Sequence, residues 1–295
     1  MKKSHLSIVL LSMALAITGC GGSDDNDSDN EQSSGENNNG TDNVSTTTSN
    51  WNNDDAVNWI THSALTTVLP NQFLDVLIMD TDEFIFDVAE CSSGSYTNTN
   101  NIVTFNNCKT TFLDEDGVVL SGKVSYVLSD DSESFSYDSL NLTFSDNLKA
   151  AINGKVDYAL DSETSTVIKI DDFKVVSDEN YDGKYYSMTT AVSDYTSTWD
   201  WGSDDEFSIE ASGTVQVTDS PFDDFAVKFN TTDANRFKSS ANPYDGGLKV
   251  VDASNAKNYS TLDYNSDATT VIYQSYADDK LVINKTISWD DIYDF

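Results

Sequence analysis

The sequence predicts a mainly β fold: an antiparallel meander of repeated hairpins that forms a curved sheet, a half-barrel or a sandwich, with one N-terminal helix. Two observations predict it. From Glu83 onward, short stretches alternate apolar and polar residues, and turn-forming Gly, Asn, Asp and Ser separate them about every ten residues, as is typical of antiparallel sheets. A short motif also recurs along these stretches, which indicates a repeated hairpin unit.

Residues 1–19 have the pattern of a signal peptide. Lys2 and Lys3 provide a positive start, and an apolar run follows from Leu6 to Ile17. This run of about twelve residues is short for a transmembrane anchor, because spanning a bilayer core takes about 20. We therefore expect an exported protein.

The end of this run, Ile17-Thr18-Gly19-Cys20, resembles the lipobox of bacterial lipoproteins. The resemblance implies that the chain is cut before Cys20, and that acyl chains on Cys20 anchor the protein to the membrane. Because Gly21 rather than Asp follows, it also implies the outer membrane, with the protein periplasmic or surface-exposed. An ordinary signal peptide with an incidental cysteine is the alternative.

Residues 20–50 are expected to form a lipidated, disordered, acidic tether. After Cys20 the segment is built from Gly, Ser, Asn, Asp, Glu, Gln and Thr, with Val44 as its one aliphatic residue. Such a segment cannot bury enough apolar surface to offset its ordering entropy. A chain of about thirty residues has a mean span of about 30 Å, so the domain is held near the membrane without lying on it.

Residues 51–295 are expected to form a single β-rich domain, with its helix near 54–69. Asp54 and Asp55 suit the start of a helix, and Leu69-Pro70 suits its end. Between them, apolar residues recur every three or four positions, as on one helix face. The next apolar segment, Phe73–Met79, fits either another helical turn or a buried strand.

With Cys20 lipidated, Cys91 and Cys108 remain, and two cysteines in an exported chain most simply form a disulfide. The turn-rich segment 92–101 and the alternating segment 102–105 place this bond across a hairpin. Closing a loop of about fifteen residues stabilises the fold by about 3 kcal/mol on the chain-entropy model. Tight turns are predicted at Asp116-Gly117 and Asp182-Gly183.

The recurring motif is a Gly-x-Val strand. It has three copies, in which the glycine could permit a bulge that curves the sheet: Ser121-Gly122-Lys123-Val124, Asn153-Gly154-Lys155-Val156 and Ser212-Gly213-Thr214-Val215. A second sheet or the N-terminal helix must cover the apolar face of these hairpins. With the disulfide hairpin, the repeat resembles exported β-rich lipoproteins across residues 85–160, and this resemblance implies an architecture without an activity.

Charge restricts the partners of the chain. It has 16 basic and 50 acidic residues, a net charge of −34, and Arg236 is the single arginine. Such a surface repels nucleic acid and anionic lipid head groups. Solubility is the simplest explanation for the acidity, and a cationic partner or bound divalent ions are the alternatives.

Three features are candidates for function. Trp199 and Trp201 alternate on one strand near Tyr195, which predicts an aromatic platform for a sugar or peptide. The alternative is that these rings belong to the core. Asp114 and Asp116 begin like a weak Ca²⁺ loop but lack the remaining ligands, and they also suit a hairpin turn.

The third feature is a carboxylate pair of the glycosidase type, which the sequence cannot locate among 50 acidic residues. Apart from His5, His62 is the one histidine, and no nucleophile motif accompanies it, so we expect it on a helix surface. No cofactor is implied beyond weak Ca²⁺. The leading hypothesis is a noncatalytic envelope lipoprotein that binds a protein, glycan or apolar ligand. A carbohydrate-binding protein and a carboxylate-dependent hydrolase are the alternatives.

Overall fold

The computed structural model describes residues 50–69, 73–181, 184–202, 206–220, 224–238 and 242–293. The predicted signal peptide, Cys20, nearly all of the tether and the Asp182-Gly183 turn lie outside these residues. No helix in the described ranges is long and apolar enough to cross a membrane.

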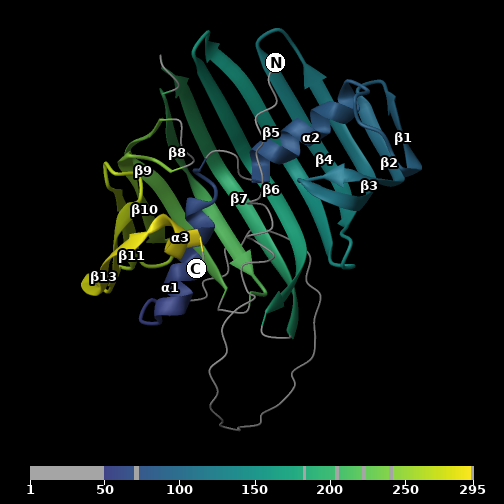
Figure 1. Ribbon diagram of the computed structural model, residues 1–295. Coiled ribbons are helices and arrows are strands. Elements are labelled where there is room, and N and C mark those ends of the chain that lie inside the picture. The colour runs from purple at the N-terminus through teal and green to yellow at the C-terminus, as the bar shows by residue number, and fades with distance from the viewer. Residues whose placement is uncertain are drawn as a thin grey trace.

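Across the described ranges, thirteen strands form one antiparallel sheet in which every strand pairs with its neighbours in the sequence. The sheet curves but does not close, as Figure 1 shows. The predicted β meander is therefore confirmed, as an open sheet. The strands are β1 (Ser93–Thr99), β2 (Ile102–Phe112), β3 (Glu115–Leu128), β4 (Ser132–Thr143), β5 (Lys149–Ser162), β6 (Ser165–Tyr181), β7 (Lys184–Trp201), β8 (Glu206–Thr218), β9 (Phe225–Lys238), β10 (Asp245–Asp252), β11 (Tyr259–Tyr264), β12 (Thr270–Ala277) and β13 (Lys280–Ser288).

Three helices, rather than the one expected, occur in the described ranges: α1 (Asp54–Leu65), α2 (Phe73–Ile85) and α3 (Trp289–Tyr293). The segment left open between helix and strand, Phe73–Met79, is therefore the first part of α2. In Figure 1, α1 and α2 lie against the same face of the curved sheet. We call this the inner face. The helices provide the cover that a second sheet would otherwise give.

The boundaries of α1 differ from the prediction. Asn53 is the N-cap, and its side chain accepts hydrogen bonds from the backbone of Asp55 and Ala56. The helix ends at Leu65, four residues before Leu69. Beyond it, Thr66 and Thr67 donate their hydroxyls to carbonyls of the last helical turn, which favours turns there.

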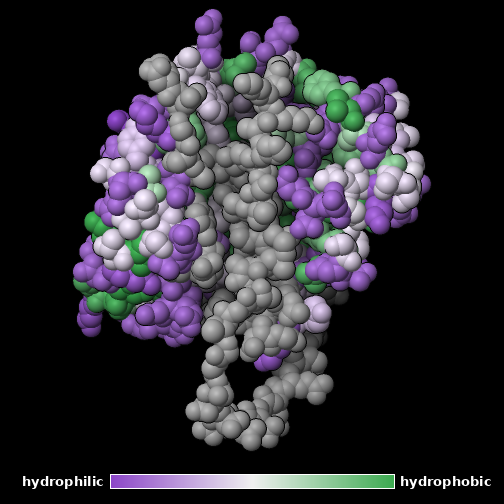
Figure 2. Space-filling view, viewed as in Figure 1, coloured by the Kyte–Doolittle hydropathy of each residue, from purple (hydrophilic) through white to green (hydrophobic). Residues whose placement is uncertain are grey.

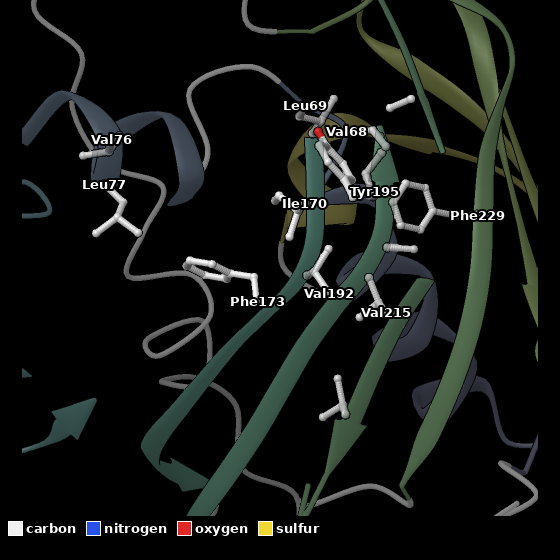
Figure 3. Packing of buried hydrophobic residues seen from close by; sticks show 14 of the residues in the cluster. Val68, Leu69, Val76, Leu77, Ile170, Phe173, Val192, Tyr195, Val215 and Phe229 are labelled. Carbon is white, nitrogen blue, oxygen red and sulfur yellow. The ribbon is translucent and has the colours of Figure 1, made fainter. Parts of the chain in front are cut away.

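Tyrosine hydroxyls join the helices to the inner face. Tyr195 donates to the carbonyl oxygen of Thr67 at 2.9 Å. The hydroxyls of Tyr273 and Thr61 lie 3.4 Å apart, and those of Tyr137 and Thr81 lie 3.3 Å apart. Figure 3 shows Tyr195 reaching toward Val68 and Leu69 from the sheet. Each contact satisfies a buried phenol while its ring packs in the core.

The disulfide forms as predicted. Cys91 and Cys108 are bonded, and Cys108 lies in β2 of the first hairpin. The bond holds the chain that leaves α2 against the first two strands. Phe84 of α2 adds edge-on ring contacts with Tyr96 of β1, at 5.0 Å, and with Phe105 of β2, at 4.9 Å between centroids. This end of the sheet therefore has both a covalent and an aromatic connection to the helix.

A line of bulges crosses the sheet and bends it. Gly122 and Gly154, the glycines of the first two repeat copies, have φ of +120° and +126°, and strand register shifts beside both. Asn107 of β2, Ser139 of β4 and Asp194 of β7 also have positive φ. We call this line the crease. The predicted role of the glycines in curving the sheet is thus confirmed for two copies, whereas Gly213 lies outside the positive-φ range.

The predicted turn at Asp116-Gly117 is wrong by a few residues. Leu113 and Asp114 have φ of 56° and 59° and connect β2 to β3, while Gly117 lies inside β3. Two consecutive residues with positive φ are the pattern of the turn that suits antiparallel hairpins. The general preference of Asp, Asn and Gly for turns therefore predicted the turn at the wrong pair of residues.

The crease predicts unequal costs for two glycine substitutions. A Cβ on Gly154 would lie 2.5 Å from the carbonyl oxygen of Asp172 and 2.6 Å from Cα of Phe173, whereas one on Gly117 would meet only the flexible side chain of Lys109, at 3.2 Å. Both positions have positive φ. Gly117→Ala should therefore cost about 1 kcal/mol of unfolding free energy, and Gly154→Ala about 3 kcal/mol, because its backbone must also move. Urea unfolding measures both, and equal costs would show that the crease is not a tight constraint.

Candidate ligand-binding shelf

Aromatic residues gather on the inner face at the edge of the sheet where β5 and β7 end and β6 and β8 begin. Strand pairing places Leu160 opposite Thr166, Thr166 opposite Trp199, and Trp201 opposite Phe207. Directly paired residues of an antiparallel sheet point to the same face. Of these side chains, Leu160 and Trp201 are exposed and Trp199 and Phe207 are half-buried. We call the surface formed by Tyr158, Leu160, Trp199, Trp201 and Phe207 the shelf.

A stack of rings supports the exposed indole of the shelf. Phe237 is fully buried and lies 4.7 Å from Phe207, with the two rings 6° from parallel. Phe207 in turn lies 5.2 Å from Trp201. Trp201 keeps 49% of its surface exposed. A large ring that is fixed from behind and open in front can bind a ligand with little loss of side-chain entropy.

The predicted pair of tryptophans lies on one face, as alternation required, but does not form a flat platform. The rings of Trp199 and Trp201 are tilted by 44°, with centroids 5.9 Å apart. Trp199 is half-buried, and its indole nitrogen donates to the hydroxyl of Ser197 at 2.9 Å. Trp201 is therefore the more available ring, and Trp199 lines the shelf beside it.

Tyr195, the third member of the predicted platform, belongs to the core. It is buried, and its hydroxyl is used by Thr67 at the end of α1. Figure 3 shows it between the helix end and Phe229 of β9. For Tyr195 the core alternative holds, because it lies nearer the middle of the sheet, where α1 covers the inner face.

A pair of carboxyl groups lies at the other end of the shelf. Glu133 of β4 pairs with Tyr158 of β5, and its charge acts on the carboxyl group of Asp82 of α2. Desolvation, reinforced by the charge of Glu133, raises the pKa of Asp82 to about 6. Its Oδ1 atom is buried without a hydrogen-bond partner. From β4 to β8 is four strand spacings, so Glu133 and Phe207, on either side of the shelf, are about 19 Å apart across the strands.

A second carboxyl group of α2 lies away from the shelf. Asp80 accepts a hydrogen bond from the backbone of Leu113, and burial raises its pKa to about 6, with Asp114 and Glu83 adding to the effect. Asp116, the other residue of the predicted Ca²⁺ loop, accepts from the hydroxyl of Thr111 at 2.7 Å. Within the described ranges, no three His, Cys, Asp or Glu residues gather as a metal site would require. Ca²⁺ binding at Asp114 and Asp116 stays a prediction.

His62 was expected on the surface of the helix, and the structure corrects this. It is buried on α1, and desolvation lowers its pKa to about 4. Sequence reasoning missed the burial because α1 has apolar neighbours on more than one side, including Trp59 and Leu65. His62 lies outside the shelf, and its effect is on stability.

Comparison with known proteins adds no relative: no protein-family model, no curated protein and no solved structure matches the chain. The candidate site therefore depends on the geometry of the described residues. Of the residues that form the shelf, Trp199 and Trp201 were predicted from their spacing in the sequence alone. Tyr158, Leu160 and Phe207 were missed, because only the register of the strands shows that they lie beside these tryptophans.

Burial of His62 predicts a specific loss of stability in acid. The unfolded chain binds a proton near the ordinary pKa of 6.5, whereas the folded protein resists it until about pH 4. Stability due to this group is therefore complete above pH 6.5 and falls as the pH decreases toward 4. At pH 4.5 the loss is about 2.5 kcal/mol relative to pH 7.5.

The substitution His62→Leu removes this effect. The difference in unfolding free energy between variant and wild type should shift by about 2.5 kcal/mol in favour of the variant from pH 7.5 to 4.5, as measured by urea titrations at each pH. Taking the difference cancels the opposite contributions of Asp80 and Asp82, whose raised pKa values favour folding in acid. A difference that is independent of pH would mean that His62 is not buried in solution.

Proposed function

We propose that this protein is a lipid-anchored envelope lipoprotein that binds a glycan chain along the shelf without chemical catalysis. The observation that carries the proposal is the half-exposed Trp201, supported from behind by stacked Phe207 and Phe237. An indole offers a flat apolar surface that suits the C–H face of a sugar ring. The proposal keeps the noncatalytic binding role expected from the sequence and specifies its ligand class.

Polar groups along the shelf suit the hydroxyls of such a chain. Glu133 and the hydroxyl of Tyr158 lie on adjacent strands at one end. The Tyr158 hydroxyl donates to Thr166 at a long 3.4 Å, so a ligand could compete for it. Binding sites commonly combine apolar walls with a few such polar groups. The span of about 19 Å from Glu133 across the shelf to Phe207 favours several sugar units in a row over a single compact ligand.

The proposed lipid anchor at Cys20 would determine where in the envelope the domain acts. If Cys20 carries acyl chains, as the lipobox resemblance implies, more than one chain is needed for stable attachment. A tether over residues 20–50 would leave the domain free to move about 30 Å from the membrane surface. This reach suits a protein that holds an envelope polymer close to the membrane, where acidic charge keeps the domain off anionic lipid.

Glycan binding predicts a loss of affinity in Trp201→Ala. Removing the stacking surface should weaken binding to any polysaccharide that the wild type retains by roughly tenfold or more, because an aromatic contact and its buried area contribute about 1.5–2 kcal/mol. Isothermal titration of the full-length protein in detergent, with polysaccharides chosen from an array, measures this. Tyr185→Ala is the matched control, since Tyr185 is an exposed aromatic residue of the same strand.

Two results would contradict the glycan proposal: a wild type that binds nothing on the array, or equal affinities for Trp201→Ala and the wild type. Release of reducing ends from a bound polysaccharide would instead favour the hydrolase alternative, for which Asp82 and Glu133 are the first carboxyl groups to replace. Trp201→Ala and Tyr185→Ala should both keep the wild-type unfolding midpoint, because the side chains of Trp201 and Tyr185 are exposed.

The anchor has its own test, in Cys20→Ser. We expect the wild type in the membrane fraction and the variant in the soluble fraction, because serine cannot carry the thioether-linked lipid. Fractionation of expressing cells followed by immunoblotting measures the distribution. A variant that stays with the membranes as the wild type does would remove the lipid anchor from the proposal and leave the shelf unaffected.

A further inference from the structure

Helix α2 presents apolar side chains to solvent as well as to the core. Met79 is 64% exposed, Phe86, the first residue after the helix, is 60% exposed, and Val88 is 68% exposed. Met79 and Phe86 are seven positions apart, which places them two turns apart on one side of the helix. We call these three residues the α2 stripe. Figure 2 shows hydrophobic surface at the upper right, over the end of α2.

The opposite side of α2 packs against the sheet. Leu77, Phe84 and Ile85 are buried against the sheet, and Thr81 lies against the hydroxyl of Tyr137. An ordinary surface helix has one apolar side and one polar side. The α2 stripe is therefore not needed for the core, and clustered apolar residues of this kind commonly mark an interaction site.

The chain holds the end of the α2 stripe in a fixed conformation. Asp87 has φ of 54°, and the amides of Val88 and Ala89 donate to the carbonyl oxygen of Glu83 at 2.7 and 3.0 Å. This is the left-handed helix cap in which the residue at the position of Val88 normally packs back on the helix. Here Val88 remains exposed. Tyr96 also donates to the carboxylate of Asp87 at 3.2 Å, which ties the cap to β1.

Acidic side chains surround the stripe. Glu83 lies between Met79 and Phe86 on the helix surface, and Glu83, Asp87 and Glu90 are all exposed. The sequence of α2 contains no lysine or arginine. A complementary surface must therefore combine apolar side chains with positive charge. A second copy of this chain would bring the same negative charges, and anionic lipid would be repelled as well.

We infer that the α2 stripe is a docking site for a partner protein, which inserts an amphipathic segment with apolar residues flanked by lysine or arginine. Met79, Phe86 and Val88 receive the apolar side chains. Glu83, Asp87 and Glu90 pair with the positive ones at the rim. The site is on α2, and no residue of it belongs to the shelf, so the inference stands independently of glycan binding.

The experiment uses a fluorescent 18-residue amphipathic helix of leucine and lysine as the probe, with the full-length protein in detergent. Fluorescence anisotropy gives its affinity for the wild type and for the triple variant Met79→Ser, Phe86→Ser and Val88→Ser. The triple variant should bind at least tenfold more weakly. Val127→Ser is the matched control, because Val127 is 63% exposed on β3, away from α2, and it should bind like the wild type.

A scrambled peptide of the same composition separates docking from general attraction between opposite charges. It should bind at least tenfold more weakly than the probe to the wild type, and higher salt should weaken the binding of both. The inference is overturned if the probe does not bind the wild type, if the triple variant binds as tightly as the wild type, or if the scrambled peptide binds as well as the probe. It is also overturned if the wild type self-associates through the stripe, which sedimentation of the wild type and triple variant without peptide would show.

Discussion

The rest of the structure depends on the crease, where residues with positive φ bend the strands. At Gly122 and Gly154 a side chain would meet the backbone of the next strand at less than 3 Å. The strands can therefore approach closely only if these positions are glycine. If the thirteen described strands had a uniform twist and no bulges, the sheet would not curve around the helices, and its inner face would stay open. The crease instead wraps that face around two short helices, which gives an open sheet a closed core.

Covering a curved sheet with two short helices has a second consequence, because α1 and α2 are shorter than the sheet is wide. The tyrosine hydroxyls that join helix to sheet lie at Tyr137, Tyr195 and Tyr273, along the central part of the inner face. Beyond this region, the strands β5 to β8 continue to their ends, and no such hydrogen bond to a helix occurs there among the described residues. Their apolar side chains there pack on each other, and they form the shelf. The same residue alternation that builds the core therefore also builds the candidate binding surface.

How far the sequence predicts this structure depends on the range of the contacts involved. The meander, the disulfide and the bends at Gly122 and Gly154 follow from local patterns, and they are confirmed. The identity of α2 was ambiguous, because its apolar residues cover two sides and its period resembles neither a surface helix nor a strand. The burial of Tyr195 was not predictable, because Thr67, which it contacts, lies 128 residues away. The effect of Glu133 on the pKa of Asp82 was not predictable for the same reason, because the two residues lie far apart in the sequence.

The negative charge of the chain is consistent with both candidate surfaces. It disfavours nucleic acid and anionic membranes through long-range repulsion, but a neutral glycan feels little of it. A basic partner, in contrast, is attracted from a distance, and the acidic rim of the α2 stripe then adds contacts at short range. Since the shelf and the α2 stripe share no residue, one ligand need not displace the other. Charge would thus select the class of partner, while the exposed rings and aliphatic side chains determine where each partner binds.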